Sequence, residues 1–338
     1  MMSQRAAAWF AVVLTALLAG CQQPRPTDMT LQRGSQLLAA GSPKSAIPFL
    51  TQTIASTPDG PEPVALLSLA YALDQQADRA IAQARQVRRP ADAAPGWEAV
   101  AMGIAEMTRR QPGPAQAHLQ RVTASAPADS AISAAARQWL AMSQVLAGQY
   151  DQALETLGEL AQLDSMRTSV MLWSALIYAR QGRVQEASQA LAKAATGIAD
   201  PRRASVGDGD LSGQALYDSA VAAVAAGQLD EAQDRFLNLQ RKDGGAGDTQ
   251  VWLALIAAAI HDWQTGQDLL KDASQSGPPQ ARGLAHQLLS VASALDDRPD
   301  KMIEHMLTGQ RLLGRNSAPT YIVEQPKPES VWFSDMMK

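Results

Sequence analysis

The residues of this chain that could do chemistry are few. The histidines are His118, His261, His286 and His305, and no two of them have the i, i+4 spacing of a metal-binding pair on one helix. None belongs to an HExxH pattern, which would add a glutamate as general base. We therefore predict structural or solvent-exposed roles for all four histidines, and no metal site.

Two short stretches also have a simpler explanation than ligand binding. Asp208-Gly209-Asp210 resembles the start of a calcium loop, but the later carboxylates and the closing glutamate are missing. We expect Asp210 or Ser212 to cap the next helix instead. Gly244-Gly245-Ala246-Gly247 follows a predicted helix rather than a strand, so it does not predict a phosphate-binding loop. Without a catalytic triad or a nucleophile elbow, we expect no enzyme, no cofactor and no small-molecule substrate.

The single cysteine stands at a position that predicts lipidation. An apolar run over residues 6–18 is too short for a comfortable membrane span and has the proportions of a signal peptide. It ends in a sequence that resembles a bacterial lipobox, Leu18-Ala19-Gly20-Cys21. The resemblance implies cleavage after residues 1–20 and a lipid on Cys21. The alternative is an ordinary secretory signal that ends near a cysteine.

The residue after the cysteine bears on the location of the protein. Gln22, rather than an aspartate, follows Cys21. By the sorting rule of such lipoproteins, this implies the periplasmic face of the outer membrane. Residues 21–27, with Pro24 and Pro26, are then a short lipidated tether. The mature chain would have 28 basic and 33 acidic residues, a net charge of 28 − 33 = −5, and no thiol free to form a disulfide.

Composition favours an all-α protein. The chain of 338 residues is 46% hydrophobic but only 5% aromatic, and it shows no run of alternating apolar and polar residues between turn signals. A formal net charge of −4 argues against a nucleic-acid-binding protein, which normally has a basic surface.

The clearest pattern covers residues 171–194. Apolar and small residues at Ala175 and Tyr178, and again at Ala187 and Leu191, have helical spacing on either side of Gly182. A glycine between two such patterns suits a tight turn, because it tolerates left-handed backbone angles. One helical hairpin cannot bury its apolar face alone, so further copies should stack beside it.

This spacing resembles the tetratricopeptide repeat (TPR), a 34-residue helix–turn–helix unit. Eight units begin near residues 27, 61, 96, 134, 168, 213, 247 and 283, so three intervals equal the family period and two carry insertions. The small residues that match the family pattern include Gly34, Ala46, Gly103, Ala115, Ala141, Ala153, Ala220 and Ala232. Most units lack the leading tryptophan of the family, which blurs the boundaries by a residue or two. The resemblance implies an all-α, right-handed α-solenoid of about eight hairpins.

The predicted organisation has repeats 1–5 over residues 28–200, a linker or insertion loop over 201–212, and repeats 6–8 over 213–315. The linker is either a hinge between two halves or a surface loop that the stack ignores, and we favour the loop. A tail over 316–338 loses the pattern and contains Val331-Trp332-Phe333. It is either an arm with a docking motif or a cap on the last repeat.

In TPR folds the first helix of each unit lines a concave groove, and in this chain those positions are apolar. The predicted groove residues are Leu69, Ile104, Met107, Met142, Val145, Leu176, Val221, Val224 and Leu255. As a groove they would bind an amphipathic helix or an extended apolar segment of another protein. The alternative is that they are core, because a helix that is apolar all round is usually buried. The lysine and asparagine of the family's carboxylate clamp are absent.

These features together predict a non-enzymatic adaptor held by its lipid at the outer membrane. Bacterial proteins that look similar include pilotins, which escort secretin subunits, and lipoproteins of tight-adherence pilus assembly. The alternatives are a structural subunit of an exopolysaccharide or cellulose export system, or an adaptor for periplasmic proteases or peptidoglycan hydrolases. These links rest on fold and location alone.

Overall fold

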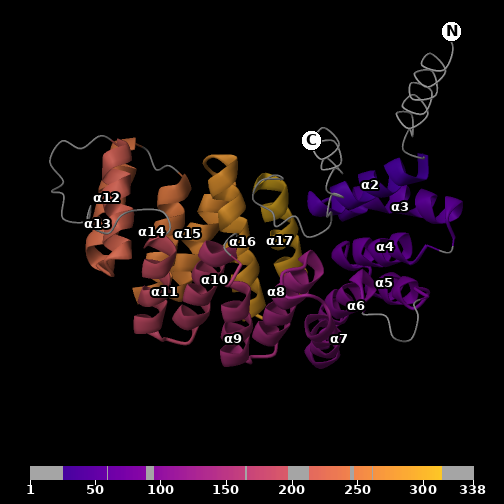
Figure 1. Ribbon diagram of the computed structural model, residues 1–338. Helices are drawn as coiled ribbons and strands as arrows, with labels where there is room; N and C mark the ends of the chain where they lie inside the picture. Colours follow the sequence, from indigo (N-terminus) through magenta and orange to yellow (C-terminus); the bar gives the residue numbers. More distant parts are fainter. Residues whose placement is uncertain are drawn as a thin grey trace, which may run out of the picture.

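A computed structural model describes residues 26–58, 60–88, 95–163, 166–196, 213–243, 247–260 and 262–313. Within these ranges the chain forms 16 helices and no strand, and the helices pair into eight antiparallel hairpins (Figure 1). The predicted all-α solenoid of about eight hairpins is confirmed. None of the described helices is both long and apolar enough to cross a membrane.

Each hairpin has a first and a second helix. The first helices are α2 (Pro26–Ala39), α4 (Pro61–Leu73), α6 (Trp97–Thr108), α8 (Ala131–Leu146), α10 (Arg167–Arg180), α12 (Gly213–Ala225), α14 (Gly247–Ile260) and α16 (Pro279–Leu295). The second helices are α3 (Pro43–Ser56), α5 (Ala77–Ala84), α7 (Pro112–Ser125), α9 (Tyr150–Leu160), α11 (Val184–Thr196), α13 (Leu229–Asp243), α15 (Trp263–Gln275) and α17 (Pro299–Leu313).

In each of the seven hairpin turns that the structure describes in full, one residue has the left-handed backbone conformation. In the α10–α11 turn Gly182 has φ +71°, and the Arg183 N–H donates to the Tyr178 carbonyl at 2.9 Å, which ends α10 as the glycine predicted. Three hairpins place a residue other than glycine in the same left-handed conformation. These residues are Gln75, Arg110 and Asp297, with φ between 54° and 60°.

Small residues let the two helices of a hairpin approach closely. A Cβ atom added to Gly103 on α6 would lie 2.6 Å from Leu119 on α7, and one added to Gly34 would lie 2.7 Å from Leu50. Leu119 and Leu50 are both fully buried. The small residues that carry the repeat pattern are therefore the contact points of the hairpins, which explains their regular spacing.

The stack continues across the predicted linker. Residues 201–212 lie outside the described residues, but α11 and α12 on either side of them pack against each other. This contact favours the loop interpretation over the hinge. The tail over 316–338 also lies outside the described residues.

The solenoid curls tightly enough for its last hairpins to meet its first ones. Helix α16 packs against α8 and α10, α14 packs against α10, and α17 reaches α6; Figure 1 shows α16 and α17 alongside α8. The Gln138 side-chain amide on α8 lies 3.2 Å from the Met306 sulfur on α17, and an Arg110 guanidinium nitrogen lies 2.8 Å from the Asp297 carboxylate. The protein's own helices thus fill much of its concave side.

Candidate functional site: a pocket on the concave side

The nine predicted groove residues are all core residues in the structure. Each is at most 2% exposed, with Ile104, Met142, Val221 and Val224 at 0%. Side chains that are covered to this degree offer little surface to a partner, so the core interpretation is favoured for eight of the nine residues, and Leu255 is the exception because it lines the pocket described next. On α8, α10 and α14 the tight curl contributes to this burial, because it brings α14 and α16 onto α10 and α8; on α4, α6 and α12 the main covering helices are neighbours in the stack. The predicted residues at the amino terminus (Leu18, Ala19, Gly20 and Cys21) lie outside the described residues.

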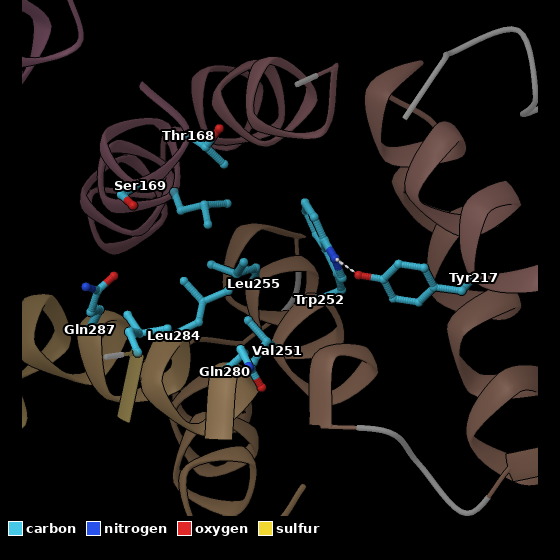
Figure 2. Close-up of a pocket in the computed structure, with 11 residues that line it drawn as sticks. Thr168, Ser169, Tyr217, Val251, Trp252, Leu255, Gln280, Leu284 and Gln287 are labelled. Atoms are coloured by element: carbon cyan, nitrogen blue, oxygen red, sulfur yellow. Dashed lines mark hydrogen bonds between the residues drawn. The ribbon is translucent and has the colours of Figure 1, made fainter. Parts of the chain in front are cut away.

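One part of the concave side stays open. A pocket of about 300 Å³ lies where α10, α12, α14 and α16 meet the end of α17 (Figure 2). Its apolar lining comes from Leu172, Val251, Leu255, Leu284 and Leu313, and its other lining residues are Thr168, Ser169, Tyr217, Trp252, Gln280 and Gln287. Leu255 is the only one of the nine predicted groove residues that lines it.

An aromatic cluster holds one wall of the pocket in place. The Trp252 indole N–H donates to the Tyr217 hydroxyl at 3.2 Å, as Figure 2 shows. Behind it the Phe236 ring stacks on Trp252 with an interplanar angle of 7° and meets Tyr217 edge-on. Phe236 is fully buried, so it supports the Trp252 and Tyr217 rings from behind.

The lining defines the chemistry that the pocket can recognise. None of its eleven lining residues is charged, and its polar groups are hydroxyls and amides. Such groups can pair with the backbone of an extended peptide, while the leucines and Trp252 cover an apolar side chain. The pocket therefore suits an uncharged apolar segment and does not suit a phosphate or a carboxylate ligand, for which it has no basic partner.

The sequence alone did not reveal this pocket, because its residues come from repeats 5, 6, 7 and 8. In each repeat the lining residues look like ordinary helix positions. Only the repeat pattern, together with the curl of the stack, brings Ser169 and Leu284 to the same cavity across 115 residues of sequence (284 − 169). The period of the repeat predicts stacking, but not how tightly the stack curls.

Two histidines meet where the sequence predicted no pair. The Nδ1 atoms of His286 on α16 and His305 on α17 lie 2.9 Å apart, and both rings are half-buried. Burial and the neighbouring His305 lower the pKa of His286 to about 4, and burial also lowers the pKa of His305. The separation of 19 residues across a hairpin is the signal that a search for i, i+4 pairs missed.

Of the other two histidines, only His118 lies among the described residues. Burial and the nearby Arg121 lower the pKa of His118, which lies half-buried on α7. His261 and Asp208–Asp210 lie outside the described residues. In the described part of the chain no group of three or more histidine, cysteine or acidic side chains could hold a metal ion.

Comparison with known proteins returns TPR structures. No family model and no curated protein matches the chain. Among solved structures it is similar to YrrB, a TPR protein with an unusual peptide-binding site, at 13% identity and TM-score 0.38, over 58% of this chain and 92% of that one. A TPR protein from Parabacteroides merdae gives 11% identity and TM-score 0.41, over 80% of this chain and 98% of that one. The APC/C heterotetramer Cut9–Hcn1 gives 15% identity and TM-score 0.41, over 90% of this chain and 56% of that one. Similarity at this level carries no information about activity or partners.

Proposed function

We propose that this protein is a lipid-anchored adaptor on the periplasmic face of the outer membrane. It would bind an apolar segment of a protein partner during assembly of an envelope machine such as a secretin or a pilus. The observation that carries the proposal is the combination of a Leu18-Ala19-Gly20-Cys21 lipobox with a helical solenoid that keeps one uncharged pocket open. A lipid provides location, and a preformed concave pocket provides recognition.

The pocket supports a protein partner over a small molecule. Its apolar residues come from four separate helices, and its hydroxyls on α10 and α12 and amides on α16 lie beside them, which suits a chain that needs both side-chain burial and backbone pairing. An uncharged lining also agrees with a partner segment that is hidden in its own final assembly. Segments of membrane-inserted or fibre-forming subunits have this character before assembly.

The test is a crosslinking capture from intact cells that compares the wild type with Cys21→Ser and with Leu284→Glu. Leu284 is half-buried and lines the pocket, so the glutamate places a charge in the pocket without removing core volume. The matched control is Val184→Glu on α11, because Val184 is 45% exposed and does not line the pocket.

We expect the wild type and Val184→Glu to capture a secretin or pilus component. Cys21→Ser should capture less of this component, and Leu284→Glu should capture none. Equal capture by all four proteins would refute pocket binding. Recovery of an exopolysaccharide export component, a protease or a peptidoglycan hydrolase would instead select one of the alternative assemblies. Partners that are found only in the cytoplasm would contradict the lipobox interpretation.

A further inference from the structure

The pocket lies beside the point where the described chain ends. Leu313, the last described residue of α17, is itself one of the lining residues. The sequence continues for 25 residues, 314–338, beyond this point. The described chain therefore ends at a residue that lines this pocket.

The tail contains a segment whose chemistry matches the lining. Ser330-Val331-Trp332-Phe333-Ser334 is uncharged and lies between Glu329 and Asp335. An uncharged pocket accepts the three apolar residues and leaves the flanking carboxylates in solvent, where they need no partner. Tryptophan and phenylalanine also bury a large area with only two rotatable side-chain bonds, so their ordering costs little entropy.

The distance is within easy reach. Trp332 is 19 residues beyond Leu313 (332 − 313), which allows up to roughly 60 Å when extended and a typical end-to-end distance of about 25 Å for a flexible chain. At that separation the effective concentration of the segment at the pocket is on the order of millimolar. Even a weak interaction would then keep the pocket occupied.

We propose that Val331-Trp332-Phe333 occupies the pocket between α10, α12, α14 and α16 of its own chain and acts as an internal competitor of the partner segment. Binding of the tail depends only on the pocket, whereas its role as a competitor rests on the function proposed above. A partner must then displace the tail, so only a segment that binds more tightly or is locally concentrated at the membrane is accepted.

The first experiment uses the purified, full-length, lipidated protein in detergent with no partner present. Trp332 is replaced by the photo-crosslinker p-benzoylphenylalanine, and the crosslinked peptides are mapped by mass spectrometry. We expect crosslinks within one molecule to the pocket segments of α14 and α16, around Val251–Leu255 and Gln280–Gln287. The yield per molecule should not change with protein concentration.

The matched control places the same crosslinker at Tyr321, an aromatic position in the same tail. Its crosslinks to α14 and α16 should be severalfold weaker. Equal or stronger crosslinks from position 321, crosslinks to other surfaces, no crosslinks, or a yield that rises with protein concentration would each overturn the proposal. The last outcome would place the tail on a second copy of the chain.

A pocket variant completes the test. Leu284→Glu should reduce the crosslink from position 332 severalfold, and Val184→Glu should leave it unchanged. If Leu284→Glu does not fold, as judged by circular dichroism, Gln280→Glu on the exposed rim takes its place. Unchanged crosslinking with a folded pocket variant would overturn the proposal. The readout needs no partner, so a failure here is distinct from a failed capture in cells.

Discussion

At the residue scale, single glycines decide how closely the helices of a hairpin pack. A Cβ atom at Gly103 would overlap fully buried Leu119, whereas one at Gly158 in α9 would meet nothing within 4 Å. Both are helix positions where alanine should gain about 0.5–1 kcal/mol from reduced backbone entropy. Only at Gly103 does the methyl group also force the neighbouring helix to move.

We predict that Gly103→Ala lowers the free energy of unfolding by about 1–3 kcal/mol, because strain from overpacking outweighs the gain in helix propensity. Gly158→Ala should raise it by about 0.5–1 kcal/mol. Chemical denaturation of the two variants and the wild type measures both effects. Stabilisation by both substitutions would mean that α6 and α7 can separate without cost.

The histidine pair predicts a pH dependence of stability. His286 has an unfolded pKa near 6.5 and a folded pKa of about 4, and the folded pKa of His305 is also lowered. Between these values the unfolded chain binds more protons than the folded one. The contribution of the neutral pair to the free energy of unfolding is therefore complete above about pH 6.5, and it is lost as the pH drops toward about 4.

The charges around the pair are mixed. Arg282 and Arg311 act on His286 in the same direction as burial, and Glu304 opposes them; Lys301 and Arg298 act on His305. Thermal melts at about pH 7 and about pH 5 should show a loss of stability that His286→Gln/His305→Gln largely removes. The control variant His118→Gln should keep the larger part of this pH-dependent loss of stability. An unchanged slope in the double variant would show that the pair is not responsible.

At the element scale, three turns have a left-handed residue other than glycine, and these turns belong to repeats 2, 3 and 8. The Arg110 and Asp297 side chains form an ion pair at 2.8 Å, and the Gln75 amide donates to the Asp300 carbonyl at 3.0 Å. A left-handed residue other than glycine costs about 1–2 kcal/mol. At these three positions the backbone strain accompanies a polar contact across the closure. Gly41 also lies at the closure, but a Cβ atom there would come within 2.6 Å of the Leu307 carbonyl oxygen, and one at Gly182 would meet nothing within 4 Å.

We predict that Arg110→Gly changes stability by less than about 1 kcal/mol. Relief of strain offsets the loss of an exposed ion pair that contributes about 0–1 kcal/mol, together with the entropy of the added glycine. Gly182→Ala should cost about 1 kcal/mol, because it adds the strain without adding a contact. Denaturant midpoints of the two variants decide this, and a large loss for Arg110→Gly would show that the ion pair holds the closure.

At the scale of the whole molecule, contacts between the ends should make distant repeats cooperate. An open solenoid loses stability only near a mutated repeat, because each repeat contacts only its neighbours. Here Met306 on α17 is buried against Gln138 on α8. We predict that Met306→Ala speeds hydrogen exchange in α8 as well as in α17.

Helices α12 and α13 serve as the internal control, because neither of them packs against α17. Their exchange should stay close to that of the wild type, and the overall loss of stability should be about 2–5 kcal/mol. Faster exchange that is confined to α16 and α17 would mean that the closing contacts carry little energy. Hydrogen exchange followed by mass spectrometry resolves these segments.

The repeat arrangement could be predicted from sequence and the binding surface could not. The spacing of Gly34, Gly103 and Gly182 depends on the local sequence alone, so it can be recognised without a structure. The structure has a hairpin for each predicted unit. The curl of the stack is a sum of small rotations between hairpins, and no single residue encodes it. Leu69 and Met142 have the same apolar character whether they face a groove or an opposing helix, so their burial could not be read from their type.

The closure of the two ends has a consequence for biosynthesis. During synthesis or export the amino-terminal repeats appear first. Helices α8 and α10 are covered only when α16 follows, and α16 begins 99 residues after the end of α10 (279 − 180 = 99). At roughly 5–20 residues per second this leaves apolar faces uncovered for several seconds or longer. The early repeats are thus natural clients for chaperones and proteases, and quality control can tell a truncated chain from a complete one.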